Sequence, residues 1–498
     1  MRDERGGKVP WSAHPGRGGR TVLPVGVGPV VLRSPRAERA VALRAVPWCL
    51  AVVVLLVSTS ITGLPSARAK APGRTWAKIQ HVVIVLMENH AYDNLFGRYC
   101  PTTNAVCPTA AIGIPPNACI PRSTFNASRG CIVPFNFTAQ NLTVADMPHV
   151  RYASLLAWDH GKMNGFYGAE LNRSETFGTY NGSLIPTYWD LAEEFGLGDD
   201  MFSSTLSYSL PNHWYTIAAD EPAILKTLPG DFQYTTIQQH HVYLNQANRT
   251  PTVEQELANA PNVSWAYYDF ALQSYSQAIQ HSITTGFGSA YDNWNPLAAK
   301  VQSYNQTSHF RPTVQFFHDV ATGALPNISW VIPGSNESDH PPANMTRGQD
   351  FVASIVNAIG RTAYWNSTAV FVTWDDYGGF YDGVTPPYFK TDSLSFRVPL
   401  LVVSPWTPAG TVVSTEYDFE SLLHFVEWRW ALGCLKPRDC QANLPKAFFD
   451  FQSHRSPVRF PDWANASYPY AAPAPGSPWF VQNATRSDGW ISNESTAD

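Results

Sequence analysis

The sequence predicts an α/β fold whose central sheet is mostly parallel, with helices on both faces. Residues 79–86 and 369–373 are short, continuous runs rich in β-branched residues, as expected for strands buried on both sides. Apolar residues recur at helical spacing over residues 351–359 and stop at Gly360. Helices that alternate with short apolar strands are typical of a parallel sheet.

Two later segments continue this pattern. Residues 398–404 form a further apolar run, and a second helical pattern follows Asp418 and ends at Gly433. The chain has 498 residues, of which 44% are hydrophobic and only 15% charged, so it can bury a large core and is not a disordered protein. We expect one principal domain over residues 77–455, with a Cys- and Pro-rich insertion at 98–145 and a Pro- and Asn-rich tail at 456–498.

The first 70 residues differ from the rest of the chain. They hold 11 Lys and Arg against 3 Asp and Glu. The apolar run at 46–64 follows Arg44 and precedes Ala67-Arg68-Ala69, a small-x-small pattern suited to a signal peptidase. The order of these features predicts an export signal. The alternative is an uncleaved anchor that contacts the membrane through residues 46–64.

Without residues 1–70 the chain holds 23 basic and 36 acidic residues, a net charge of −13. Nucleic-acid partners call for basic surfaces, so we expect none. The acidic balance gives no electrostatic support for binding an anionic membrane either. No oligomeric state is predicted.

Cysteines and glycan acceptors also point to export. Six cysteines lie outside the apolar run: Cys100, Cys107, Cys119, Cys131, Cys434 and Cys440. The last two are the natural late disulfide, while pairing among the first four stays open. Zinc binding by those four is a weaker alternative, because they lack a tight C-x₂₋₄-C pair. Asn-x-Ser/Thr occurs 15 times, which predicts a glycosylated protein, secreted or at the cell surface.

Polar residues follow two of the predicted strands directly. Glu88 and Asn89 come after the first strand, and Asp375 and Asp376 come after residues 369–373. Ligands bind at the carboxyl ends of strands in such sheets, and these oxygen donors suit a divalent cation whose identity the sequence leaves open. The alternative is structural: Glu88 caps a following helix, and the two aspartates begin a Gly-rich turn.

Two more segments carry reactive side chains. Residues 199–213 are rich in hydroxyl groups and include Ser209, although by composition alone they predict a turn. His340 lies in Ser-Asp-His-Pro-Pro, where two prolines stiffen the loop. A lone histidine is more often structural than catalytic.

Together these segments resemble the phosphoesterase family that contains bacterial phospholipases C and a group of acid phosphatases, related in fold to alkaline phosphatase. The resemblance covers roughly residues 77–435. It is carried by MENHAYDNLFG at 87–97, SYSLPNH at 207–213, SDHPP at 338–342 and WDDYGGFYDG at 374–383. The second of these matches the family's Gly-Pro-Thr/Ser-x-Pro-Asn-Arg motif only loosely. A shorter element, a histidine followed by Gly-x-Met-Asn-Gly-Phe, fits His149 and residues 161–166.

The resemblance implies an alkaline-phosphatase-like fold and hydrolysis of a small phosphoester or a phospholipid. It implies Ser209 as the nucleophile that forms a phosphoseryl intermediate. His149 and His340 would contact the phosphoryl oxygens or serve the leaving group. One divalent metal ion would be held by four residues: Glu88, Asn89, Asp375 and Asp376.

The chain departs from the family at several histidines. Gly383 stands where the family often has His, Trp294 replaces the His of a His-Asn-Pro segment, and residues 417–419 replace a His-bearing version. The alternative function is therefore a glycosylated cell-surface protein with a degenerate, inactive site. A sulfatase is disfavoured, because the chain has no Cys-x-Pro-x-Arg segment.

Overall fold

The computed structural model describes residues 72–100, 113–114, 117–227, 237–269, 294–300, 309–387 and 394–461. The predicted export signal or anchor and most of the predicted tail lie outside these residues. Within them, no helix is long and apolar enough to cross a membrane.

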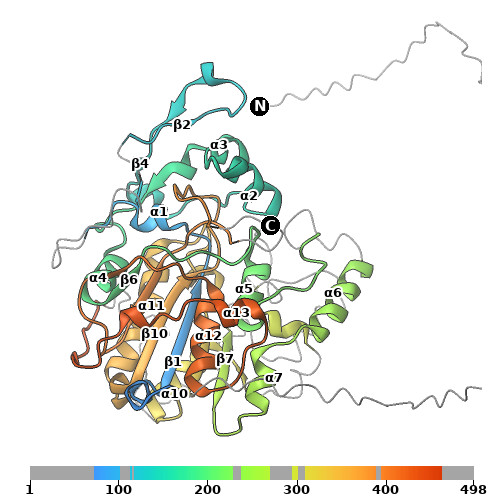
Figure 1. The fold of residues 1–498 in the computed structure, drawn as a ribbon. Coiled ribbons are helices and arrows are strands. Elements are labelled where there is room, and N and C mark those ends of the chain that lie inside the picture. Colours follow the sequence, from blue (N-terminus) through green and yellow to red (C-terminus); the bar gives the residue numbers. More distant parts are fainter. Residues whose placement is uncertain are drawn as a thin grey trace, which may run out of the picture. The chain divides into compact units, whose positions relative to one another are not determined.

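An eight-stranded sheet forms the centre, in the order β12-β6-β11-β10-β1-β9-β7-β8 (Figure 1). β1 (His81–Met87) pairs in parallel with β10 (Thr368–Trp374) on one side and with β9 (Ile328–Ile332) on the other. β7 (Trp265–Asp269) continues the parallel part next to β9, and β8 (Phe310–Arg311) follows it. The predicted runs at 79–86 and 369–373 are thus confirmed as neighbouring parallel strands.

The other end of the sheet changes direction. β11 (Leu400–Val403) is antiparallel both to β10 and to β6 (Gly196–Gly198). β12 (Thr411–Val413) is parallel to β6 and closes this edge. The sheet is therefore mostly parallel, as predicted, with one strand reversed.

Helices cover both faces of the sheet, and the side chains of β10 show this directly. Phe371 packs edge-on against Phe425 of α12, with ring centroids 5.5 Å apart. Trp374 packs edge-on against Tyr188 of α4, at 5.1 Å. Residues an odd number of positions apart in a strand point to opposite faces, so α4 and α12 lie on opposite sides of the sheet.

Each of these two helices belongs to a layer. α4 (Pro186–Glu194) packs on α11 (Met345–Gly360), which packs on α10 (Thr313–Thr322). α12 (Phe419–Trp430) packs on α5 (Ser209–Ala218), which in turn contacts α7 (Val253–Ala258). α6 (Ile237–Arg249) is a further helix of this half of the chain.

The two predicted helices begin at capping residues. α11 starts earlier than the predicted 351–359 because the Asn344 side chain accepts a hydrogen bond from the Thr346 amide at 2.9 Å. α12 starts after Asp418, whose Oδ1 accepts from the Ser421 amide at 2.8 Å. Each cap satisfies an amide that the first helical turn leaves without a partner.

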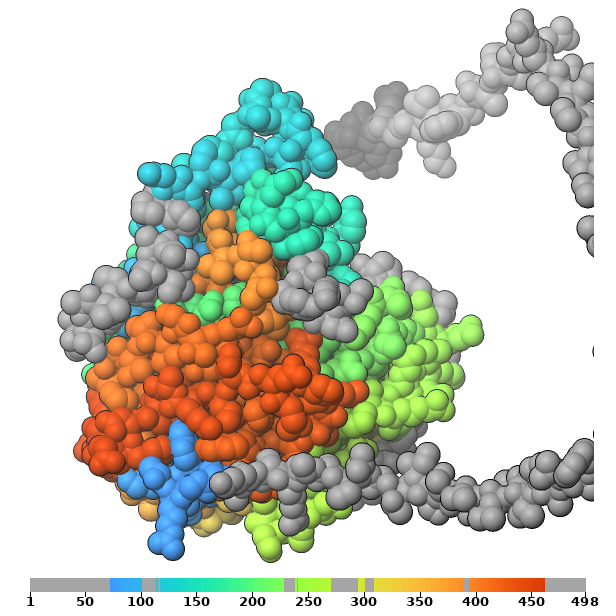
Figure 2. Space-filling view, in the orientation of Figure 1, coloured from blue at the N-terminus to red at the C-terminus, as the bar shows by residue number. Residues whose placement is uncertain are grey.

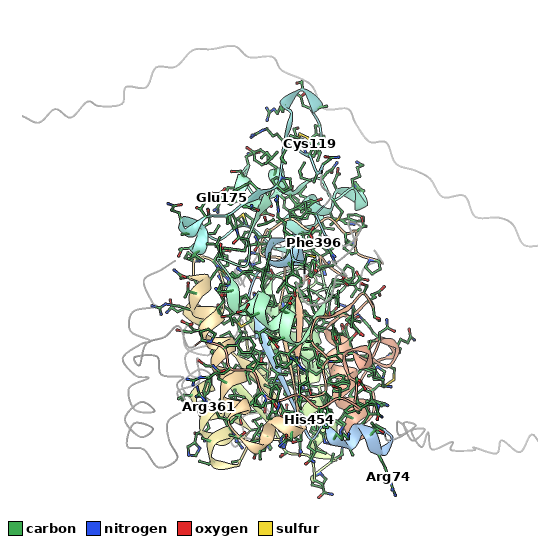
Figure 3. All side chains as sticks on the ribbon, turned by 90° about the vertical axis from the view of Figure 1, so that its left-hand side faces the viewer. Arg74, Cys119, Glu175, Arg361, Phe396 and His454 are labelled. Atoms are coloured by element: carbon green, nitrogen blue, oxygen red, sulfur yellow. A yellow bond between two sulfur atoms is a disulfide. The ribbon has the colours of Figure 1, made fainter. Side chains whose placement is uncertain are left out.

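Residues 117–145 of the predicted insertion belong to a region that we call the crown, residues 117–171. It contains the hairpin of β2 (Ile120–Pro121) and β3 (Cys131–Ile132), then β4 (Phe135–Asn136), α2 (Arg151–Trp158) and α3 (Phe166–Ala169). β4 pairs with β5 (Gly178–Thr179). The crown lies beyond α1 (Tyr92–Phe96), which follows β1, so it covers the carboxyl ends of the parallel strands (Figures 1 and 2). Figure 3 accordingly places Cys119 at the opposite end of the described chain from Arg74 and His454.

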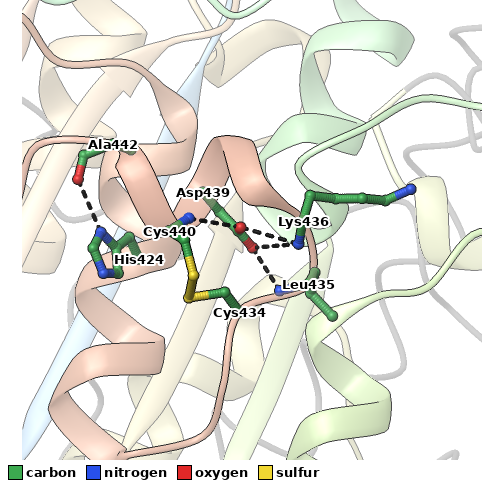
Figure 4. The surroundings of a disulfide bond; sticks show 7 residues. All are labelled: His424, Cys434, Leu435, Lys436, Asp439, Cys440 and Ala442. Atoms are coloured by element: carbon green, nitrogen blue, oxygen red, sulfur yellow. Dashed lines mark hydrogen bonds between the residues drawn. A yellow bond between two sulfur atoms is a disulfide. The ribbon is translucent and has the colours of Figure 1, made fainter. Parts of the chain in front are cut away.

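The disulfides agree with the cysteine pattern. Cys434 and Cys440 are bonded, as predicted, around α13 (Pro437–Gln441) (Figure 4). Cys119 bonds Cys131. Cys100 is also disulfide-bonded, while Cys107 lies outside the described residues. Three of the early four cysteines are therefore disulfide-bonded, so zinc binding by all four together is wrong.

Candidate active site

The ends of three strands meet where the first motif begins. Asp375, the first residue after β10, donates its amide hydrogen to the Met87 carbonyl at the end of β1, at 2.9 Å. Glu88 donates its amide to the Ser338 carbonyl, in the loop after β9, at 2.8 Å. The parallel register thus brings segments far apart in the sequence to one point, as expected of a site at the carboxyl edge.

Ser209 opens a helix rather than a turn. The structure corrects the composition-based expectation for residues 199–213, because α5 begins at Ser209 and runs for ten residues. Ser209 Oγ donates to Glu88 Oε2 at 2.9 Å and lies 3.5 Å from Asn89 Oδ1. The predicted nucleophile is therefore in direct contact with the first motif.

In both Asp375 and Asp376 one carboxylate oxygen, Oδ1, accepts backbone hydrogen bonds that shape the local turn. Asp375 Oδ1 accepts from the amides of Asn89 and Asp376, at 2.8 and 2.7 Å, and Asp376 Oδ1 accepts from the Gly378 amide at 2.7 Å. These bonds form the Gly-rich turn that we considered as an alternative. Asp375 Oδ2, however, is buried without a hydrogen-bond partner among the described residues.

Glycine is required where this turn meets the first motif. Gly378 has φ +57°, and a Cβ atom there would lie 2.1 Å from the Asn89 carbonyl oxygen. Asn89 itself has φ 57°, a left-handed conformation that asparagine tolerates. Glu88 does not cap α1, because the residue at that N-cap is Ala91, which makes no side-chain bond. The capping alternative is therefore wrong.

His213 is the residue of this site that the sequence interpretation missed. Its Nε2 lies 2.8 Å from Glu88 Oε1 and 3.9 Å from Asp375 Oδ2. Its Nδ1 lies 2.9 Å from the Trp294 carbonyl oxygen. His213 follows Ser209 by four residues, a spacing that puts both side chains on one face of α5. That spacing is informative only for a helix, and the segment was predicted to be a turn.

His149 and His340 lie beside this cluster. His149 Nδ1 is 2.7 Å from the Met147 carbonyl oxygen, so Nε2 can accept a hydrogen bond from Asn89 Nδ2 at 3.3 Å. The rings of the two histidines are 6.1 Å apart. The Trp294 ring, which stands where the family has a histidine, lies 5.8 Å from the His340 ring.

The carboxyl groups of Glu88, Asp375 and Asp376 are buried close together and repel one another when ionised. Glu88 is fully buried, and this burial together with the charges of Asp375 and Asp376 raises its pKa well above the usual value. Burial lowers the pKa of His213 to about 4, although Asp375 and the Trp294 carbonyl act in the opposite direction. Carboxylates held this close need a proton or a cation between them.

Two groups of side chains have the spacing of metal ligands. One oxygen or nitrogen atom from each of Glu88, His213 and Asp375 lies within 4.8 Å of the others. Asp146, His149 and His340 form a second such group. The first group is fully buried and contains Asp375 Oδ2, which accepts no hydrogen bond from the described residues, so its donors fit a divalent cation.

The sequence model of the Phosphoesterase family matches residues 79–433, which contain all of these side chains. The chain belongs to the Phosphoesterase family. This phosphoesterase is 25% identical over 453 residues to phospholipase C B of Mycobacterium tuberculosis (strain ATCC 25618 / H37Rv), covering 82% of this chain and 83% of that protein. It is 27% identical over 389 residues to non-specific phospholipase C6 of Arabidopsis thaliana, covering 69% and 66%.

Solved structures give a more distant likeness. The lipoteichoic acid synthase LtaP of Listeria monocytogenes aligns over 85% of this phosphoesterase and 96% of its own chain, with 8% identity and a TM-score of 0.37. A protein of the alkaline phosphatase superfamily from Vibrio parahaemolyticus aligns over 75% and 71%, with a TM-score of 0.35. The family match, by contrast, establishes this phosphoesterase as a hydrolase of phosphoester bonds.

Proposed function

We propose that this phosphoesterase cleaves its substrate through Ser209 and requires one divalent metal ion. The observation that carries the proposal is the contact of Ser209 Oγ with Glu88 Oε2 at 2.9 Å, at the carboxyl ends of β1 and β10. The ion would be held by the residues that the motifs single out: Glu88, Asn89, Asp375 and Asp376. When bound, it would supply positive charge that favours the Ser209 alkoxide and offsets charge on the phosphoryl oxygens.

Side chains of the protein would carry out the remaining steps of the reaction. Ser209 is the first residue of α5, where the helix dipole favours negative charge on Oγ. Oγ attacks phosphorus and forms a P–O bond, while the bond from phosphorus to the ester oxygen breaks. His149 and His340 would contact the phosphoryl oxygens or give the departing oxygen a proton, and the 6.1 Å separation of their rings supports a shared role. Water then cleaves the phosphoseryl bond and restores the Ser209 hydroxyl.

The crown favours a phospholipid over a small soluble ester. Except for Val242, every exposed large hydrophobic side chain of the described residues lies between residues 125 and 171. Phe125 is 99% exposed, Leu171 70% and Tyr152 65%. Exposed apolar side chains in the crown, which lies over the carboxyl ends of the parallel strands, suit contact with the surface of a lipid aggregate. The names of the relatives, phospholipases C, agree with this choice.

The protein would act outside the cell. The disulfides need an oxidising compartment, and the apolar run at 46–64 and the glycan acceptors indicate export. We therefore propose a secreted or cell-surface glycoprotein.

A second candidate function is a surface glycoprotein with an inactive site. It is favoured by one observation: Gly383 and Trp294 occupy positions where the family often has histidine, and Trp294 lies against His340. Fewer imidazoles near the phosphoryl group would weaken proton transfer to the leaving oxygen.

The test uses the full chain, produced through a secretory pathway so that disulfides and glycans form. Release of phosphate from monoesters and of phosphorylated head group from phospholipid vesicles is measured before and after chelation, and after a divalent metal is returned. We expect head-group release that chelation abolishes and metal restores. Metal binding without turnover on any ester, at acidic, neutral or alkaline pH, would establish the second candidate instead.

A further inference from the structure

His213 lies in the metal site although the family motifs do not place it there. The side chain is fully buried, and its Nε2 is 2.8 Å from Glu88 Oε1 and 3.9 Å from Asp375 Oδ2. The resemblance gives four metal ligands, none of them a histidine. It therefore assigns His213 no role in binding the ion.

The hydrogen bond of His213 to the Trp294 carbonyl determines which ring nitrogen carries a lone pair. Nδ1 lies 2.9 Å from the Trp294 carbonyl oxygen, which can only accept, so Nδ1 carries the hydrogen. In the neutral ring, Nε2 then presents a lone pair toward Glu88 and Asp375. A ring whose one nitrogen donates to a backbone carbonyl while the other points at carboxylates has the arrangement of a metal-bound histidine.

The atoms that face one another in this arrangement are all able to bind a cation. His213 Nε2 lies 2.8 Å from Glu88 Oε1 and 3.9 Å from Asp375 Oδ2. Asp375 Oδ2 has no hydrogen-bond partner among the described residues. A cation bound by all three atoms, which lie within 4.8 Å of one another, satisfies them together.

We infer that His213 Nε2 binds the same ion as Glu88 and Asp375, and that this ion is a first-row transition metal rather than magnesium or calcium. Imidazole nitrogen suits zinc, iron and copper, whereas magnesium and calcium take oxygen ligands almost exclusively. The inference depends on the metal site of the proposed function and specifies which class of ion that site holds.

The test reads the metal environment directly. The full chain carrying His149→Gln and His340→Gln, which removes the imidazoles of the second group, serves as the reference protein and is loaded with one equivalent of Cu²⁺. Pulsed electron paramagnetic resonance detects the remote nitrogen of a bound imidazole, and zinc and magnesium affinities are measured by titration calorimetry. We expect the imidazole signal in the reference protein and its loss when His213→Gln is added. Zinc affinity should fall by at least about tenfold, because removing a ligand costs no less than removing its hydrogen-bond partner.

His90→Gln is the matched control. His90 is also buried, but its Nδ1 contacts Asn94 Oδ1 at 2.6 Å and its Nε2 contacts the Asp339 carbonyl at 3.1 Å, so neither nitrogen is available to an ion. This variant should keep the imidazole signal and the zinc affinity. An unchanged signal and affinity in folded His213→Gln would overturn the inference.

X-ray absorption of the zinc-loaded wild type keeps the inference testable if the variants do not fold. We expect outer-shell scattering from an imidazole ring, and its absence would overturn the inference. The outcomes also separate the two proposals. Metal-dependent hydrolysis without a bound imidazole contradicts only the role of His213, whereas a bound imidazole without hydrolysis of any ester contradicts only the proposed function.

Discussion

The Ser209 hydroxyl donates a hydrogen bond to Glu88 Oε2 at 2.9 Å, although 121 positions separate the two residues in the sequence. The contact joins the first residue of α5 to the residue that follows β1. It depends on the sheet as well as on the helix, since Glu88 is itself fixed by the Ser338 carbonyl. The first two predictions below concern Ser209 and the neighbouring Asp375.

Replacing Ser209 by alanine should reduce kcat/KM by at least about 10³-fold, as expected for the loss of a nucleophile. Hydrolysis of a chromogenic phosphoester measures it. Ser207→Ala is the matched control, because Ser207 is also buried and its Oγ has no hydrogen-bond partner among the described residues. Comparable activity of the two variants would contradict the assignment of Ser209.

Replacing Asp375 by asparagine should weaken metal binding while leaving the turn largely intact. Asn retains an oxygen that can accept from the Asn89 amide, as Asp375 Oδ1 does at 2.8 Å, but it removes a negative charge from the site. We expect the zinc dissociation constant to rise by at least about tenfold, in line with the cost of disturbing a metal site. Calorimetric titration measures it, with Asp450→Asn, in a distant loop, as the control. Equal affinities in both variants would contradict the assignment of Asp375.

Replacing Phe125 by serine should lower activity on phospholipid vesicles but not on a soluble chromogenic ester. Phe125 is 99% exposed, so the substitution leaves the core unchanged and removes apolar surface from the crown. Parallel assays on vesicles and on the soluble ester measure the difference. The same substitution at the exposed Val242, outside the crown, should leave both rates unchanged. Unaltered vesicle hydrolysis by the Phe125 variant would argue against membrane contact through the crown.

Replacing Arg397 by methionine should destabilise the fold by about 3–5 kcal/mol. Arg397 donates to Asp382 Oδ1 at 3.0 Å and to Asp93 Oδ1 at 3.2 Å, and all three side chains are fully buried. Without the guanidinium, two buried carboxyl groups lose their partner. Urea unfolding measures the free energy of unfolding.

The exposed pair of Lys162 and Asp159 provides the comparison for Arg397. Their charged atoms are 3.3 Å apart, but the Lys162 side chain is 64% exposed. Lys162→Met should therefore cost less than about 1 kcal/mol. If Lys162→Met and Arg397→Met lowered the free energy of unfolding by similar amounts, burial would not determine how much an ion pair contributes to stability.

The folded protein should lose stability as the pH rises from 5 to 8. Burial, with the charges of Asp439 and Glu256 as further causes, raises the pKa of Glu427 from 4.5 to about 11. Burial likewise raises the pKa of Glu256 to about 7. An acid whose pKa is higher in the folded state contributes its full stability below its unfolded pKa and loses it as the pH rises toward the folded one.

Glu427 alone contributes a slope of up to about 1.4 kcal/mol per pH unit over this range. Thermal unfolding at pH 5 and pH 8 measures the effect. Glu427→Gln should reduce the difference in Tm between the two conditions. If the difference in Tm between pH 5 and pH 8 were equal or larger in this variant, Glu427 would not be the cause of the pH dependence.

The sequence by itself determined the central strands and which residues form the candidate site at their carboxyl ends. β1 and β10 were predictable because strands buried on both faces must be continuously apolar, and local capping signals such as Asp418 mark helix starts. The rule that ligands bind at the carboxyl ends of parallel strands then singled out Glu88 and Asp375, which the structure places at adjacent strand ends.

Only the tertiary structure decided the surroundings of these residues. The reversal of β11 depends on pairing with β10 and β6, which a short apolar run does not encode. His213 contacts Glu88, which is 125 positions away in the sequence, and the Trp294 carbonyl orients its ring. Contacts of this kind form between side chains that local periodicity does not relate, so the group of side chains around Glu88 could be recognised only from the packing of the sheet and α5.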